Sequence, residues 1–206
     1  MSLFELLSQG GWSMYPIYLC SVVALAVFVK KLLEIRAARL WDMGWLEAVV
    51  GALGRNQSEQ LATALKSSPH PGTRVVAAML STLSRRPDRA EAEGRRVGSL
   101  ELQQLEKNLA LLSFIAQAAP LLGLLGTVLG MVDLFLGLQG TGMANVDVST
   151  LSSGIWKALL TTAAGLLVAV PTLAGYSYLT SRTDHLRLQL ANAIQRVLTE
   201  APVEAA

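Results

Sequence analysis

Residues 109–132 read LALLSFIAQAAPLLGLLGTVLGMV, a run of 24 residues that contains no Asp, Glu, Lys, Arg or His. Two further runs of 24 residues, at 6–29 and 158–181, are equally free of charge. A helix rises about 1.5 Å per residue, so each run can reach roughly 36 Å, against a hydrocarbon core of about 30 Å. The sequence therefore predicts an all-α membrane protein with three transmembrane helices.

The basic residues are distributed very unevenly along the chain. Of the 17 Lys and Arg residues, 13 lie between residues 30 and 107, three follow residue 181, and the last is Lys157. Basic residues near the ends of membrane spans stay on the cytoplasmic side. The middle segment and the tail are therefore expected inside the cell, with the N-terminus outside. No basic residue precedes the first run, as a secretory signal would require, so we expect an uncleaved span.

These observations divide the chain into seven segments. We expect a short N-terminus outside the cell at 1–11, transmembrane helices at 12–30, 109–136 and 156–180, a cytoplasmic helical segment at 31–108, an outer loop at 137–155, and a cytoplasmic C-terminal helix and tail at 181–206. Helical spacing of leucines continues outside the second and third runs, and no proline lies between Arg89 and Ala119. The second and third spans are thus predicted to extend as two long antiparallel helices into the cytoplasm, and a short helix is predicted at Thr73–Leu83.

Small residues and prolines inside the second and third runs predict close helix contact and bending. Gly126 and Gly130 are four positions apart and share one helix face. Gly123 widens the groove that these two glycines leave on that face. Glycines let neighbouring membrane helices approach closely, and a proline removes a backbone hydrogen bond and bends a helix. The expected packing or kink positions are Gly123, Gly126, Gly130, Gly165, Pro120 and Pro171.

Threonines supply the polar atoms of interest within the same runs. Thr127 lies roughly 15 Å inside the outer end of the second span, and Thr162, next to Thr161, lies about 10 Å inside the outer end of the third. The hydroxyls of Thr127 and Thr162 are therefore expected to face each other at similar depth. The alternative is that each bonds to a carbonyl of its own helix, four residues earlier.

No carboxylate lies deep in any of the three runs. The nearest is Asp133, which we expect to be a solvated or helix-end charge at the outer end of the second span. A pump that works alone usually needs an ionisable group in the membrane. If the protein carries protons, the titrating group should come from another subunit.

The remaining segments offer no catalytic or metal-binding set. His70 lies in a Pro-rich loop and His185 on an exposed helix, and neither has a second ligand at metal spacing. No glycine loop of the phosphate-binding type occurs. Cys20, the only cysteine, is expected to be a packed thiol. The sequence therefore predicts neither an enzyme nor a cofactor, a metal or a nucleic-acid partner.

Two motifs together resemble a known family. PLLGLLGTVLGM at Pro120–Met131 is followed by GIWKALLTTAAG at Gly154–Gly165 and by AVP at Ala169–Pro171. These segments resemble the ExbB/TolQ/MotA proton-channel family, and ExbB most of all. The resemblance is strong over roughly residues 100–200 and looser over the first span and the cytoplasmic segment. The paired motifs are specific, whereas a glycine pattern alone would not be.

The resemblance implies a homo-pentameric ring in the inner membrane of a Gram-negative bacterium. In such a ring the second and third spans line a pore that holds single-span ExbD-like helices, each with a membrane Asp that binds the proton. Proton flow would drive rotation and pass work to a TonB-like protein that opens outer-membrane transporters. Thr127 and Thr162 match the pore-lining threonines near the proton path, with Thr161 beside them.

One position departs from the family pattern, and other functions stay open. ExbB and TolQ usually carry Glu where this chain has Lys157, so the charge at the predicted pore mouth, near Asp133, is reversed. Lys157 is expected to snorkel to the interface, to pair with Asp133 or Asp147, or to mark a subfamily with a different partner. The alternatives are a TolQ-like envelope-maintenance motor subunit and a non-conducting membrane scaffold. A stand-alone transporter is disfavoured by three spans without a buried charge.

Overall fold

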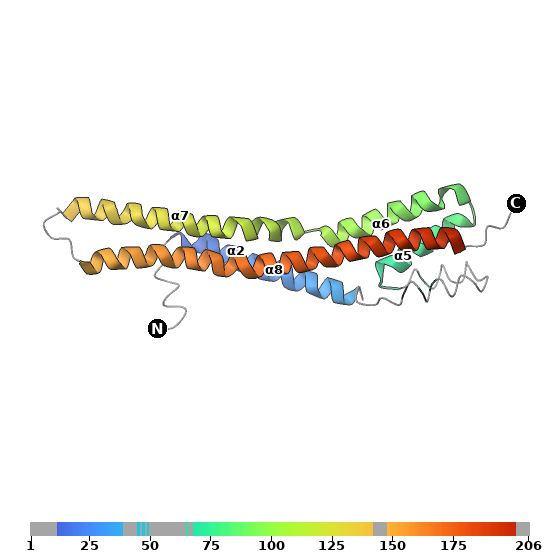
Figure 1. The fold of residues 1–206 in the computed structure, drawn as a ribbon, viewed down its shortest axis with the longest axis horizontal. Helices are drawn as coiled ribbons and strands as arrows, with labels where there is room; N and C mark the ends of the chain where they lie inside the picture. Colours follow the sequence, from blue (N-terminus) through green and yellow to red (C-terminus); the bar gives the residue numbers. More distant parts are fainter. Residues whose placement is uncertain are drawn as a thin grey trace. The chain divides into compact units, whose positions relative to one another are not determined.

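The computed structural model describes residues 12–38, 68–141 and 148–200 together with Trp45, Glu47, Val49 and Leu65, and the regular elements in this part are helices. The elements are α2 (Met14–Ala37), α5 (Pro71–Leu83), a short 3-10 helix η1 (Pro87–Arg89), α6 (Ala90–Glu106), α7 (Leu109–Thr141) and α8 (Val148–Glu200) (Figure 1). The expected N-terminal segment 1–11, much of 31–67 and the tail beyond residue 200 lie outside these ranges.

Three stretches are long and apolar enough to cross a membrane: Met14–Ala37, Pro87–Gln139 and Leu151–Glu200. They contain the three predicted spans, so the all-helical membrane fold is confirmed at this level. The chain divides into two compact units, which are described separately below. The first combines Met1–Val29 with Asn108–Ser177, and the second combines Lys30–Lys107 with Tyr178–Ala206.

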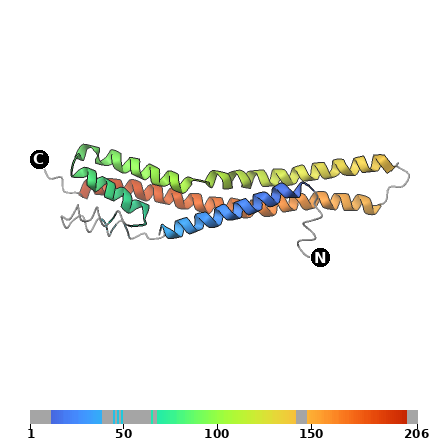
Figure 2. The same cartoon turned by 180° about the vertical axis from the view of Figure 1, so that it is seen from behind.

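In the first unit, the beginning of α2 packs against α7 and α8 (Figure 2). Met14 and Ile17 of α2 are each 1% exposed and contact Ala164 of α8, with Leu122 of α7 packed beside them. The opposite side of α2 exposes large apolar side chains at helical spacing, namely Tyr15, Leu19, Val22, Leu25 and Val29. Such a surface is costly in water and suits the acyl chains of a bilayer.

The second unit has a core of its own. Buried side chains of α5 and of the later part of α8 form it, with Trp45 and Val49 added: Val75, Val76, Met79, Leu80, Leu186, Leu190, Ala193, Ile194 and Val197. Within this unit α6 runs antiparallel to α8, because Gly94 approaches Ile194 and Gly98 approaches Leu190. Bare glycine backbone on the inner face of α6 thus brings that helix close to the core.

His70 has a structural role at the start of α5. Its Nδ1 accepts a hydrogen bond of 3.0 Å from the Gly72 N–H, and its carbonyl accepts one of 2.6 Å from the Thr73 hydroxyl. The imidazole is buried and stacks on Trp45 at 4.8 Å between ring centroids. His70 therefore caps a helix. The helix predicted at Thr73–Leu83 is confirmed and begins two residues earlier, at Pro71.

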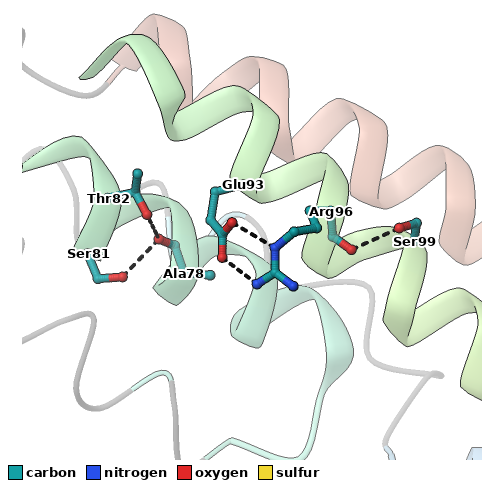
Figure 3. Close-up of polar contacts among 6 residues, drawn as sticks. All are labelled: Ala78, Ser81, Thr82, Glu93, Arg96 and Ser99. Atoms are coloured by element: carbon teal, nitrogen blue, oxygen red, sulfur yellow. Dashed lines mark hydrogen bonds and ion pairs between the residues drawn. The ribbon is translucent and has the colours of Figure 1, made fainter. Parts of the chain in front are cut away.

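The outer face of α6 is covered by ion pairs within the helix. The Arg96 guanidinium contacts Glu93 with two hydrogen bonds, of 2.8 and 2.7 Å (Figure 3). Arg95, the preceding residue, pairs with Glu91, and both of its hydrogen bonds go to one carboxylate oxygen. The hydrogen bond from Arg96 lowers the pKa of Glu93, and both groups face solvent. These pairs identify a water-exposed face on this helix.

The expectation of one continuous helix leading into the second span was wrong. α6 ends at Glu106 and α7 begins at Leu109, and Asn108 between them has φ = 71°. Asn tolerates this left-handed conformation better than other residues that carry a Cβ, because its short polar side chain forms local hydrogen bonds. Leucine spacing is helical on both sides of the break, so the pattern did not reveal it.

The predicted connection at 137–155 is helical at both ends. α7 continues to Thr141, and α8 begins at Val148. α8 covers the third span and continues without interruption to Glu200, a helix of 53 residues. Asp147 lies outside the described residues.

Candidate functional site

Glycines hold α7 and α8 in close antiparallel contact within the first unit. A Cβ added at Gly165 would lie 2.5 Å from the Ala119 carbonyl oxygen, and one at Gly123 would lie 2.9 Å from the Thr161 carbonyl oxygen. Further out, a Cβ at Gly126 would lie 2.6 Å from the Thr161 hydroxyl oxygen. Real Cβ atoms do not approach other atoms so closely, and these positions accept only glycine without a shift of the helices.

Gly130 is a less crowded position on the same face. A Cβ there would lie 3.3 Å from the Ala158 Cβ, so a small shift would accommodate it. All four glycines singled out from the sequence therefore lie where α7 meets α8. Pro120 and Pro171 lie inside helices that continue past them, and the bend expected at each stays a prediction.

The hydroxyls of two adjacent threonines on α8 converge on one carbonyl of α7. Thr162 donates to the Gly123 carbonyl oxygen at 3.0 Å. The Thr161 hydroxyl lies 2.7 Å from the carbonyl oxygen of Ala158, in its own helix, and 3.3 Å from that of Gly123. Thr161 is 1% exposed, whereas Thr162 is partly accessible. Because Gly123 has no side chain, its carbonyl is accessible to a side chain of the neighbouring helix.

Thr127 bonds differently. Its hydroxyl donates to the Leu124 carbonyl oxygen of its own helix at 2.6 Å, and the residue is partly exposed. Thr162 lies opposite Gly123, which is four residues, or about 6 Å, from Thr127 along α7. The two threonines are therefore close to one another in depth, but their hydroxyls use separate acceptors.

A cavity of about 630 Å³ opens beside these threonines in the first unit. Its lining includes both charged residues singled out from the sequence, Asp133 and Lys157, together with Thr161. In the part of the chain that the structure describes, no ion pair joins Lys157 to Asp133, although both face this cavity. The structure thus brings Asp133, Lys157, Thr161, Gly126 and Gly130 together, whereas Thr127 and Thr162 lie outside the lining.

Two serines of this cavity were missed by the sequence analysis. Ser149 and Ser153 line it with Lys157, and the three positions are four residues apart on α8. That spacing places them on one helix face. The signal was present in the sequence but was hidden, because residues up to 155 were assigned to a loop.

Metal chemistry has no support among the described residues. No group of three or more His, Cys, Asp or Glu side chains in residues 12–38, 68–141 and 148–200 is arranged to hold a metal ion. The α7–α8 contact and the cavity beside it present hydroxyls, backbone carbonyls, the ammonium group of Lys157 and the carboxylate of Asp133.

The chain is similar to known proteins over the segment that contains this site. The model of the MotA/TolQ/ExbB proton channel family matches residues 67–192, which include the α7–α8 contact. The chain is similar to biopolymer transport protein exbB1 of Vibrio cholerae, with 29% identity over 95% of this chain and 87% of that protein.

Two other relatives match over smaller shares of their own length. A putative biopolymer transport protein ExbB homolog of Methanothermobacter thermautotrophicus is 29% identical over 89% of this chain and 64% of its own length. Tol-Pal system protein TolQ of Haemophilus influenzae is 32% identical over 48% of this chain and 42% of its own length. The similarity to TolQ thus covers a smaller share of both chains than the similarity to exbB1 does.

Proposed function

Because this chain belongs to the MotA/TolQ/ExbB proton channel family, we propose that it is the proton-channel motor subunit of an ExbB–ExbD-type complex in the inner membrane. In this proposal the complex uses the proton motive force to energise TonB-dependent transport across the outer membrane. The Vibrio relative is named as a biopolymer transport protein and matches nearly the whole chain, which supports the ExbB type.

The observation that carries the proposal is the α7–α8 contact. It presents hydroxyls and a carbonyl to one another in a region without any Asp, Glu, Lys, Arg or His between residues 109 and 132 or 158 and 181. Hydroxyls can accept and donate a proton but cannot hold its charge in an apolar environment. A second subunit, a single-span ExbD-like protein, therefore supplies the membrane Asp that binds the proton.

The proposed assembly is the one that the family resemblance implies. Five copies form a ring, and α7 and α8 of each copy line its pore. Thr127, Thr161 and Thr162 lie along the proton path, and Lys157 and Asp133 lie at its outer mouth. The N-terminus is periplasmic and the C-terminus cytoplasmic, as the distribution of Lys and Arg indicates. A TonB-like protein receives the work.

Proton flux in reconstituted vesicles tests this function. The chain would be reconstituted alone and together with its single-span partner, and a potential would be imposed with K⁺ and valinomycin while internal pH is followed. We expect flux only when both subunits are present. Equal flux with the chain alone would contradict the assignment of the titrating acid to the partner, and no flux in either sample would favour the scaffold alternative.

A TolQ-like envelope-maintenance motor is the second candidate. It is supported by the 32% identity to TolQ of Haemophilus influenzae over 99 residues. The two candidates share the proton path and differ in the protein that receives the work. Affinity purification of the complex from its native membrane, followed by identification of the bound periplasmic partner, distinguishes a TonB-like recipient from another envelope protein.

Lys157→Glu is expected to leave the oligomer intact. Lys157 is exposed at the cavity and forms no ion pair with a described residue, so the reversed charge remains accessible to water. Exposed charges contribute little to packing. The mass of the purified complex in detergent, measured by light scattering or native mass spectrometry, should equal that of the wild type. Dissociation of the variant complex would show that Lys157 takes part in subunit packing.

A further inference from the structure

Two adjacent lysines of α2 have very different surroundings. The side chain of Lys30 is 66% exposed, whereas that of Lys31 is 4% exposed. Both belong to the basic residues between positions 30 and 107 that are expected on the cytoplasmic side. A buried ammonium must be paired or hydrogen-bonded to be stable, so the contacts of Lys31 are informative.

Lys31 bridges two elements of the second unit. Its Nζ lies 2.7 Å from Glu34 Oε2 in α2 and donates to the Gln104 carbonyl oxygen in α6 at 3.2 Å. Lys31 and Gln104 are 73 positions apart in the sequence. The side chain thus connects the end of α2 that follows Val29 to the last turn of α6.

The Gln104 carbonyl is available because the chain turns three residues later. Lys107 has φ = −54° and ψ = 130°, and Asn108 has φ = 71°. These angles resemble the central positions of a type II turn, which needs a residue that tolerates positive φ at its second position. In a continuous helix the Asn108 N–H would bond to Gln104, but at ψ = 130° of Lys107 that N–H points away from the helix.

A second charged contact holds the same end of α6. Arg187 of α8 pairs with Glu106, the last residue of α6, and also with Asp184 at 3.3 Å. The last carbonyls of a helix carry partial negative charge, so a cation nearby stabilises them. Arg187 is about half exposed, whereas Lys31 is buried, so Lys31 is the contact that solvent screens least.

We propose that Lys31 is a positioning residue that caps the C-terminal end of α6 and fixes the helix break at Lys107–Asn108. The contact ties the end of α2 to the last turn of α6, so that these segments move together. The functional part of the inference rests on the proposed motor function: a complex without this cap conducts protons but transmits less work to its periplasmic recipient.

Lys31→Met tests the cap, and Lys30→Met is the matched control. Both variants remove one positive charge at the same end of α2, so any effect on membrane topology is the same. Amide hydrogen exchange of the full complex would be followed in peptides that cover residues 102–112. We expect about tenfold faster exchange in Lys31→Met, because a partly buried carbonyl loses its donor, and less than about twofold change in Lys30→Met.

Lys31→Arg tests whether the hydrogen bond of residue 31, and not only the volume of its side chain, protects this region from exchange. Arginine keeps a positive charge and several donors, so protection near residue 108 should recover to within about threefold of the wild type. Equal exchange in Lys31→Met and wild type would overturn the cap, and so would equal acceleration in Lys31→Met and Lys30→Met. Exchange in Lys31→Arg as fast as in Lys31→Met would overturn it as well.

The functional arm uses two measurements on the same variant. Proton flux in vesicles should stay within about twofold of the wild type in Lys31→Met, because the contact lies outside the α7–α8 site, whereas partner-driven transport in cells should fall about tenfold. Unchanged transport would overturn the coupling role even if exchange is accelerated. Absence of proton flux in the wild-type complex would instead contradict the proposed motor function. The hydrogen-exchange result would still decide whether Lys31 caps α6.

Discussion

Gly165→Ala is expected to prevent α7 and α8 from packing and to reduce the yield of folded complex by at least about tenfold. The added Cβ would lie 2.5 Å from the Ala119 carbonyl oxygen and 3.1 Å from the Gly123 Cα. Both are backbone atoms, so no side-chain rotation relieves the clash. Overpacking in a well-packed core costs about 1–3 kcal/mol, and a clash with backbone lies at the upper end of that range. Yield and melting temperature of the detergent-extracted protein would be measured by fluorescence-detected size exclusion.

Gly137→Ala is the matched control for this substitution. It makes the same chemical change within α7, but no heavy atom lies within 4 Å of the added Cβ. Alanine also has a higher helix propensity than glycine, so this variant should be as stable as the wild type or slightly more so. Gly130→Ala should be intermediate, because its Cβ would lie 3.3 Å from that of Ala158. A fully stable Gly165→Ala protein would show that the helices are further apart than described here.

Thr162→Val is expected to abolish proton-coupled function while the oligomer stays intact. Valine has nearly the same shape but no hydroxyl, so the hydrogen bond to the Gly123 carbonyl is lost. Such bonds in membranes contribute roughly 0.6 kcal/mol on average, which is too little to dismantle the helix pair. A group that takes up and releases a proton next to the partner's acid would, in contrast, be missing altogether. Flux in vesicles and the mass of the complex are the two measurements.

Thr162→Ser keeps the hydroxyl and should retain most of the flux. Thr161→Val offers a second comparison, because the Thr161 hydroxyl is buried and already engaged with Ala158 in its own helix. We expect a smaller loss of flux at Thr161 than at Thr162. Wild-type flux in Thr162→Val, with the partner present, would favour the non-conducting scaffold over the motor subunit.

The parts of the fold that follow from composition were predictable from the sequence. Charge-free runs of sufficient length identify membrane-spanning helices, because no charged side chain is stable in the acyl region without a partner. The two motifs around Gly126 and Thr162 were sufficient to indicate the family, which the family model confirms over residues 67–192. The contact of Gly123, Gly126 and Gly165 with the neighbouring helix follows from the same small-residue pattern.

Features that depend on a single backbone angle or on burial were not predictable. Lys30 and Lys31 are identical in type and adjacent in sequence, and only the packing of α6 against the end of α2 distinguishes them. The break at Asn108 lies between two segments of equally regular leucine spacing, so hydrophobic periodicity carries no trace of it. Ser149 and Ser153 were overlooked because the end of a helix is the least certain feature of a periodic pattern.

The turn at Lys107–Asn108 also separates the helical phase of α6 from that of α7. Adding or deleting one residue in an unbroken α-helix rotates everything beyond it by about 100°. Here a length change within α6 would be absorbed at the turn, and the angular orientation of α7 would still be set by its own glycines against α8. The turn at Lys107–Asn108 therefore makes the angular orientation of α7 independent of the length of α6.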